Sequence, residues 1–194
     1  MKMSNFNVGE RQATIAVIGD ARIAEDSKKF ILAENIGKKL VDAGYRVLTG
    51  GMGGVMEAAQ KGARSSERWK SGTCIGLLPG SDPGVANDYV DIVIPTGLDH
   101  ARNLIVAQSD AVIAIGGGAG TLSEMAFAWI HRRLIIGLQC DGWSARLAGH
   151  RIDERVRYPE ITEDQVFGAD TADEVISLIE QWLPRYKRHH KLII

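Results

Sequence analysis

The alternation of apolar, β-branched runs with helix-like segments limits what this chain can fold into more than any other feature. The runs are mostly apolar throughout, whereas half-exposed strands alternate between apolar and polar residues, so we expect strands that are buried on both faces. The predicted strands are Thr14–Ile18, Arg46–Thr49, Cys74–Leu78, Asp91–Ile94, Ala111–Ile115 and Leu134–Leu138.

Segments with a helical repeat of apolar residues separate most of these strands. The predicted helices are Asp26–Ala43, Val55–Ala63, Ala101–Ser109, Thr121–His131 and a last helix that opens with a capping box at Thr171–Glu174. Strands that alternate with helices form parallel βαβ units with right-handed crossovers. The sequence therefore predicts an α/β chain with a three-layer, doubly wound, Rossmann-like fold and a mainly parallel sheet of six or seven strands.

The chain length and net charge limit the number of domains and the kinds of partner that this protein can have. The 194 residues are 45% hydrophobic and 24% charged, with a net charge of −1, which suits one globular domain. We expect its core at about residues 14–183, followed by a basic tail at 184–194 that is a solvated end or an arm on a partner subunit. A net charge near zero makes nucleic acid an unlikely ligand.

The targeting signals and cysteines favour a cytoplasmic protein. No apolar stretch has the roughly 20 residues of a membrane span, and the first residues lack the apolar core of a signal peptide. Cys74 and Cys140 lie in or beside apolar runs, far from any metal-binding spacing, so we expect two buried, reduced thiols and no metal site.

Glycine is enriched, at 22 of 194 residues, and clusters in three turns that follow predicted strands. The turns are Gly19–Ala21, Gly50–Gly54 and Gly116–Thr121. Because the carboxyl ends of parallel strands lie at one edge of a sheet, these turns can converge there. Ligands of doubly wound folds bind at this edge, where the strand order reverses.

The second and third glycine turns each lead into a predicted helix. A helix N-terminus has unpaired N–H groups and the positive end of the helix dipole, and glycine lets the backbone approach an anion closely. Neither turn is a P-loop, and the first turn lacks GxGxxG. Tight turns without a ligand are the alternative, but the pair favours phosphate or nucleotide binding. The candidate ligand-binding residues here are Gly19, Asp20, Gly50, Gly51, Gly53, Gly54, Gly117, Gly118, Gly120 and Thr121.

Four polar residues lie in or near the third turn, and two of them, Glu124 and Arg102, each have two interpretations. Thr121 and Glu124 have capping-box spacing, yet Glu124 could instead contact a ribose hydroxyl or orient a water. Arg102 and Asn103 start a predicted helix on the same edge, where an arginine could clamp a phosphate or be a surface cation.

Three other segments are expected to be ordinary structure. His100 is expected on the surface, His131–Arg133 as a solvated helix end, and Trp143 as a residue that packs a loop.

The stretches Gly50–Met56 and Gly116–Glu124 resemble the LOG-like Rossmann superfamily. This group includes the LOG cytokinin-activating phosphoribohydrolases, molybdenum-cofactor carrier proteins and, at greater distance, the DNA-processing protein DprA. Its enzymes carry Pro-Gly-Gly-x-Gly-Thr-x-x-Glu, in which Gly116 replaces the proline here. They also carry Met-x-x-Arg-Lys, which Arg102-Asn103 matches loosely.

The resemblance implies two functions. The form of the third turn is closest to that of the molybdenum-cofactor carriers, which implies a binding protein for a phosphorylated small molecule, either a nucleotide or molybdenum cofactor as bound ligand, with no required cofactor. The alternative is a nucleoside 5′-monophosphate phosphoribohydrolase in which Glu124 and Arg102 are catalytic. The resemblance also implies a homodimer or homotetramer.

Overall fold

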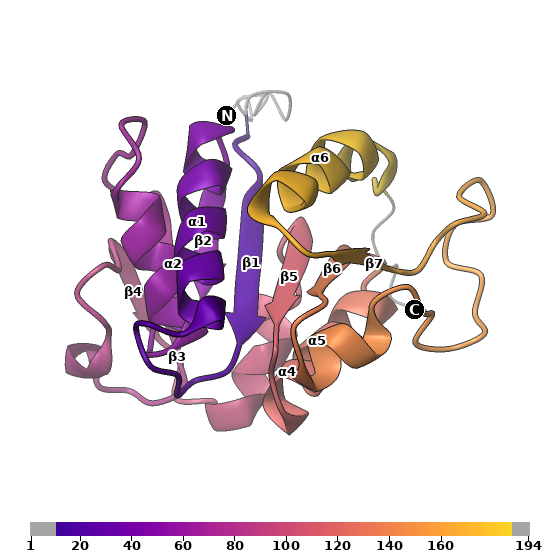
Figure 1. The fold of residues 1–194 in the computed structure, drawn as a ribbon. Helices are drawn as coiled ribbons and strands as arrows, with labels where there is room; N and C mark the ends of the chain where they lie inside the picture. Colours follow the sequence, from indigo (N-terminus) through magenta and orange to yellow (C-terminus); the bar gives the residue numbers. More distant parts are fainter. Residues whose placement is uncertain (1–10, 188–194) are drawn as a thin grey trace, which may run out of the picture.

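A computed structural model describes residues 11–187, which form a seven-stranded sheet between two layers of helices (Figure 1). The strands are β1 Thr14–Gly19, β2 Arg46–Thr49, β3 Cys74–Leu78, β4 Ile92–Pro95, β5 Ala111–Ile115, β6 Leu134–Leu138 and β7 Val166–Ala169. Every neighbouring pair is parallel, in the order β4-β3-β2-β1-β5-β6-β7. The predicted doubly wound α/β fold is confirmed.

The helices divide between the two faces of the sheet. One hydrophobic cluster joins the sheet to α1 Lys28–Asp42, α2 Val55–Arg64 and α6 Ala172–Trp182. A second cluster joins the other face to α3 Asn103–Val106, α4 Ala119–Ile130 and α5 Gly142–Leu147. Short 3-10 helices span Pro83–Val85, Asp99–Arg102 and Leu183–Arg185.

Strand β1 lies at the centre of the sheet and shows why the apolar runs do not alternate. Ile15 and Val17 belong to the first cluster, whereas Ala16 and Ile18 belong to the second, and all four are at most 2% exposed. The chain passes from β1 to β2 on one side, while β5 pairs with β1 on the other. The strand order therefore reverses between β1 and β5, where doubly wound folds bind ligands.

Several sequence expectations about local structure are wrong. The helix expected at Ala101–Ser109 is instead a 3-10 turn followed by the short helix α3. Trp143, expected to pack a loop, lies in α5, and its N–H donates to the carbonyl of Gly117 in the third glycine turn. Strand β7 was not among the expected strands, because its four residues include Gly168 and make a weak pattern. The capping box of the last helix is confirmed, since Thr171 and Glu174 form both of its hydrogen bonds.

Two residues differ from expectation in their burial. Cys74 is buried as expected, but Cys140 is exposed because it follows the end of β6 and lies outside the sheet. Arg133 is 7% exposed rather than solvated, and its guanidinium donates to Gln108 Oε1 at 3.2 Å.

The described chain ends in a packed segment. Tyr186 is 5% exposed and donates to Asp164 Oδ1 at 2.7 Å, so the core extends into the segment expected as a tail. The rest of that tail, from 188 to 194, lies outside the described residues. Between residues 11 and 187, no helix is long and apolar enough to cross a membrane.

Candidate functional site

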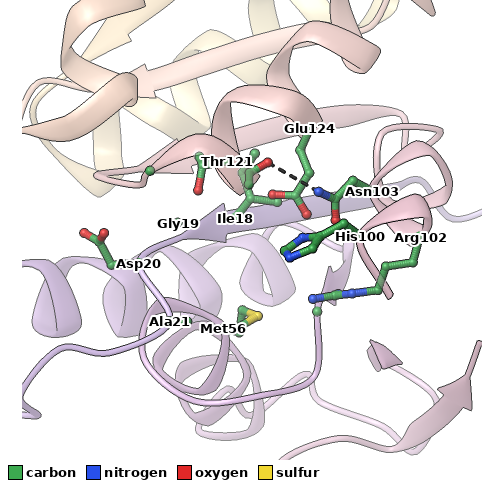
Figure 2. Close-up of a pocket in the computed structure, with 13 residues that line it drawn as sticks. Ile18, Gly19, Asp20, Ala21, Met56, His100, Arg102, Asn103, Thr121 and Glu124 are labelled. Carbon is green, nitrogen blue, oxygen red and sulfur yellow. Dashed lines mark hydrogen bonds between the residues drawn. The ribbon is translucent and has the colours of Figure 1, made fainter. Parts of the chain in front are cut away.

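A cleft of about 250 Å³ lies at the edge of the sheet where β1 and β5 end (Figure 2). Its walls come from the three glycine turns, the 3-10 helix before α3 and the first two turns of α4. The residues that line it are Ile18, Gly19, Asp20, Ala21, Gly50, Met56, His100, Arg102, Asn103, Gly118, Gly120, Thr121 and Glu124. The cleft thus occupies the point where the strand order reverses.

Most of the predicted ligand-binding residues lie together on this cleft. Those that line it are Gly19, Asp20, Gly50, Arg102, Asn103, Gly118, Gly120, Thr121 and Glu124. Four predicted glycines do not line it, namely Gly51, Gly53, Gly54 and Gly117. Ligand binding by any of these residues stays a prediction.

The third glycine turn presents the N-terminus of α4 to the cleft. Gly118 is the N-cap residue, and the first helical hydrogen bond runs from the N–H of Leu122 to the carbonyl of Gly118 at 3.0 Å. The amides of residues 119–121 therefore precede the first helical bond. A Cβ added at Gly118 or Gly120 would meet no atom within 4 Å. Open space thus lies over the positive end of the α4 dipole.

The capping-box interpretation of Thr121 and Glu124 is wrong, because α4 begins two residues earlier than expected. Its N-cap is Gly118, so Thr121 lies inside the first turn and Glu124 lies in the second. Both side chains line the cleft instead.

Helix α5 holds the third turn in place. The N–H groups of Trp143 and Ser144 donate to the carbonyls of Gly117 and Gly116, at 3.1 and 3.0 Å. In return, the N–H of Gly116 donates to Ser144 Oγ at 2.8 Å. Gly116 and Gly117 have φ of 67° and 91°, in the left-handed region that glycine tolerates. The turn is fixed before any ligand arrives, which lowers the entropic cost of binding.

The second glycine turn packs against the protein instead of opening to the cleft. Gly54 caps α2 with φ of 68°, and the N–H of Val55 donates to the carbonyl of Asp20 at 2.9 Å. A Cβ added at Gly54 would overlap the backbone of Asp20 and Ala21. Gly50 is the residue of this turn that lines the cleft. The second turn therefore shapes the wall, and its helix terminus already has a protein acceptor.

Glu124 points from α4 into the cleft (Figure 2). The residue is 8% exposed, and burial raises the pKa of its carboxyl to about 7, although the charge of Arg102 opposes this shift. A buried carboxyl with a pKa near neutrality can donate or accept a proton at physiological pH.

Arg102 lies at the end of the 3-10 helix on the opposite wall (Figure 2). Its Nη1 donates to the carbonyl of Leu77 at 2.6 Å, and a Cβ added at Gly50 would overlap the guanidinium. Burial lowers the pKa of Arg102, while the charges of Glu124 and Asp99 raise it. A guanidinium has five N–H donors, so one bond to a carbonyl leaves donors for an anionic ligand.

Comparisons with known proteins place the chain in a family. The model of the SLOG cluster4 family matches residues 12–175. This chain belongs to the SLOG cluster4 family. The resemblance to the LOG-like Rossmann superfamily is thereby confirmed.

Solved structures and sequence relatives that resemble this SLOG cluster4 protein are named for two different activities. A molybdenum cofactor binding protein from Rippkaea orientalis is 34% identical, with a TM-score of 0.72 over 89% of this chain and 98% of that one. The molybdenum cofactor carrier protein of Chlamydomonas reinhardtii is 32% identical, with a TM-score of 0.71 over 90% and 99%. A probable cytokinin riboside 5′-monophosphate phosphoribohydrolase of Oryza sativa is 31% identical over 80% of this chain and 78% of its own length.

Asn103 connects the two walls of the cleft in this SLOG cluster4 protein. Its side chain is buried, and Nδ2 donates to Ser123 Oγ at 2.8 Å. The same Nδ2 donates to the carbonyl of Gly120 at 3.5 Å (Figure 2). These bonds tie α3 to the first turns of α4. The geometry gives Asn103 a positioning role for the α4 terminus.

The sequence analysis missed four residues of the cleft. Ile18, Ala21 and Met56 line its apolar part, and His100, which was expected on the outer surface, also lines it. The position of His100 two residues before Arg102 in the sequence was the available signal. Between residues 11 and 187, no three or more His, Cys, Asp or Glu side chains are grouped to hold a metal ion.

Proposed function

We propose that this SLOG cluster4 protein binds a phosphate-bearing small molecule at the N-terminus of α4. One observation carries the proposal: Gly118 and Gly120 border open space in the cleft, directly over the first turn of the helix. A phosphate in that space would accept hydrogen bonds from the amides of residues 119–121 and interact favourably with the helix dipole. Arg102 would add a cationic donor from the other wall.

Molybdenum cofactor is the ligand that we favour, carried as cargo rather than used in a reaction. Its pterin ends in a phosphate that fits the α4 terminus, and the named structures from Rippkaea orientalis and Chlamydomonas reinhardtii bind or carry this cofactor. The cleft of about 250 Å³ lies just below the roughly 300–1,000 Å³ of small-molecule pockets. It suits the phosphate end of a ligand whose other end extends out of the cleft.

The test is retention of molybdenum cofactor released from a purified molybdoenzyme. After incubation and desalting, the fluorescence of the oxidised pterin measures how much cofactor the protein keeps. We expect stoichiometric retention by the wild type and loss of retention in Gly118→Asp, whose carboxylate would occupy the anion site. Absence of retention by the wild type, or equal retention by Gly118→Asp, would overturn the carrier function.

A second candidate is a nucleoside 5′-monophosphate phosphoribohydrolase, favoured by the buried Glu124 with a pKa of about 7. With the 5′-phosphate on α4, the N-glycosidic bond breaks, and its electron pair leaves with the base. Water then adds to the ribose carbon of the oxocarbenium-like state while the Glu124 carboxylate accepts a proton of that water, and this proton passes on to the departed base. Arg102 offsets negative charge in the cleft, and the products are ribose 5-phosphate and the free base.

Incubation with AMP and with isopentenyl-AMP separates the two candidates. Release of free base by the wild type that disappears in Glu124→Ala would establish the hydrolase and overturn a purely carrier function. Retention of molybdenum cofactor without any release of base would support the carrier. Liquid chromatography of the reaction mixture measures the released base.

We also infer a homo-oligomer from an uncovered part of the sheet. Ile92 and Ile94 of edge strand β4 are 42% and 41% exposed, on the same face as Leu77 in the register of β3 and β4. Both faces of parallel sheets are normally covered, and Leu104 and Ile105 of α3, a helix on the same face as Leu77, are also exposed. A second copy of the chain would cover it. Light scattering should give a dimer or tetramer that dissociates in Ile92→Asp/Ile94→Asp, and a wild-type monomer would refute the assembly.

A further inference from the structure

Lys29 lies in a position that its own helix disfavours. It is in the first turn of α1, where the helix dipole repels cations and where no acidic residue of that turn compensates. Its Nζ instead lies 2.5 Å from Asp20 Oδ2, and 2.9 and 3.1 Å from the two carboxylate oxygens of Asp141. Burial lowers the pKa of Lys29, but the hydrogen bonds to both carboxylates outweigh burial and raise it, so the ammonium stays charged.

The two carboxylates that hold Lys29 flank the third glycine turn. Asp20 follows β1 and lines the cleft, and Asp141 is the N-cap residue of α5. A Cβ added at Gly116 would overlap Asp20 Oδ2 and lie 3.1 Å from Asp141 Oδ1. Figure 2 shows Asp20 and Thr121 on the same side of the cleft. Two negative charges therefore stand beside the α4 terminus.

These charges oppose an anion at the α4 terminus unless a cation compensates them. Like charges repel over distances of several ångströms, most strongly where water is partly excluded. The Lys29 ammonium reduces the charge of the group from −2 to −1. Its ammonium donates to Asp20 Oδ2 and to both carboxylate oxygens of Asp141.

We propose that Lys29 is a specificity-determining residue that lets the cleft accept a phosphate dianion beside Asp20. This inference rests on the proposed phosphate site at α4. With its charge compensated, Asp20 remains on the cleft wall as an acceptor for a hydroxyl or N–H group next to the phosphate of the ligand. The cleft is thereby suited to a ligand that carries both a phosphate and such donors, and not to a bare polyanion.

The test measures the affinity for inorganic phosphate by calorimetry in low-salt buffer. Inorganic phosphate lacks the remainder of any ligand, so it reports on charge at the α4 terminus. Lys29→Met should weaken phosphate binding about tenfold, the order expected for loss of one nearby charge. Lys28→Met is the matched control, because Lys28 lies in the same turn, is exposed and carries the same charge. It should change the affinity less than about twofold, since exposed charges are well screened.

A triple variant separates charge compensation from loop positioning. Lys29→Met/Asp20→Asn/Asp141→Asn has none of the ion pairs but also none of the uncompensated charge. We expect it to bind phosphate within about threefold of the wild type. Affinity as poor as that of Lys29→Met would mean that the ion pairs position the loops, and it would overturn charge compensation.

Two further outcomes keep this inference distinct from the proposed function. If the wild type binds phosphate, Gly118→Asp loses it and Lys29→Met keeps full affinity, the role of Lys29 fails while the α4 site stands. If the wild type does not bind phosphate, both fail. Asp20→Asn alone should strengthen binding about threefold, and unchanged or weaker binding would contradict the inference even if Lys29→Met did not fold.

Discussion

The second and third glycine turns look alike in the sequence but differ in what lies over their helices. At α2, the carbonyl of Asp20 already accepts the N–H of Val55, and a Cβ at Gly54 would overlap the backbone. At α4, the space beyond Gly118 and Gly120 is open to the cleft. The comparison teaches that a glycine turn before a helix makes an anion site only when no other part of the protein occupies the helix terminus.

The largest expected effect is a loss of stability from a substitution in the second glycine turn, which we call the filled turn because the backbone of Asp20 and Ala21 packs against Gly54. Gly54→Ala should lower the free energy of unfolding by about 4 kcal/mol, since a strained left-handed backbone and an overpacked contact each cost about 1–3 kcal/mol. Urea denaturation measures the change. A loss below about 1 kcal/mol would mean that this turn is not packed as described, and the contrast between the two turns would disappear.

The pH dependence of stability also tests the comparison between the second and third glycine turns, because an acidic residue follows each of them. Glu57 lies in the first turn of α2 and is half-buried, whereas Glu124 is buried in the second turn of α4. Because the pKa of Glu124 is about 7 when folded and about 4.5 in the unfolded chain, the folded state holds this proton more tightly. The contribution of Glu124 to the free energy of unfolding is therefore fully present below pH 4.5. It falls by roughly 3 kcal/mol as the pH rises toward 7.

The measurement is the difference in unfolding free energy between the wild type and Glu124→Gln at pH 5 and pH 8. The wild type should lose stability relative to Glu124→Gln over this interval. Glu57→Gln is the control for loss of a helix carboxylate outside the cleft. Parallel behaviour of wild type and Glu124→Gln would show that the carboxyl is not buried in the cleft as described.

A substitution in the third glycine turn, which is open to the cleft, should change the affinity for phosphate rather than the stability of the fold. Gly118→Asp places a preferred N-cap residue at the start of α4, so the free energy of unfolding should be unchanged or slightly higher. Phosphate affinity should fall about a hundredfold, or ~2.8 kcal/mol, because the new carboxylate takes the anion's place. Calorimetry and urea denaturation on the same preparation test both halves. Full phosphate affinity in this variant would move the anion site away from α4.

The smallest effect should come from Gly53, the glycine of the filled turn with neither a left-handed backbone nor a close contact. A Cβ there would lie 3.5 Å from the carbonyl of Ala21, an ordinary contact. Gly53→Ala should change the free energy of unfolding by no more than about 1 kcal/mol in either direction. A gain of this size would arise because alanine restricts the unfolded chain. Phosphate affinity should be that of the wild type, and a large loss would place the second turn in the anion site.

The fold was predictable from sequence because its strands are buried on both faces. The runs at β3, β5 and β6 match the observed strands residue for residue, since a central parallel strand needs no alternation. Short elements with weak patterns, such as β7 and α5, were beyond this signal. The start of α4 was misplaced because the capping-box spacing of Thr121 and Glu124 competed with Gly118, and the tertiary arrangement selected Gly118.

The site was predictable as a cluster but not in the roles of its members. The glycine turns and the parallel topology were enough to bring Gly19, Gly50 and Gly118 to one cleft. No sequence pattern indicates that the backbone of Asp20 fills the α2 terminus, because that contact uses a carbonyl common to every residue. The burial of Glu124 likewise arises from packing between distant segments, and no local pattern encodes it.

The most direct measurement is a phosphate titration of the isotopically labelled protein, followed by the backbone amide shifts of residues 118–121 and 53–56. Saturable shifts should concentrate on residues 118–121 in the wild type and be absent in Gly118→Asp, with residues 53–56 little affected in both. Shifts that concentrate on residues 53–56, or that are absent from both turns, would contradict an anion site at the N-terminus of α4.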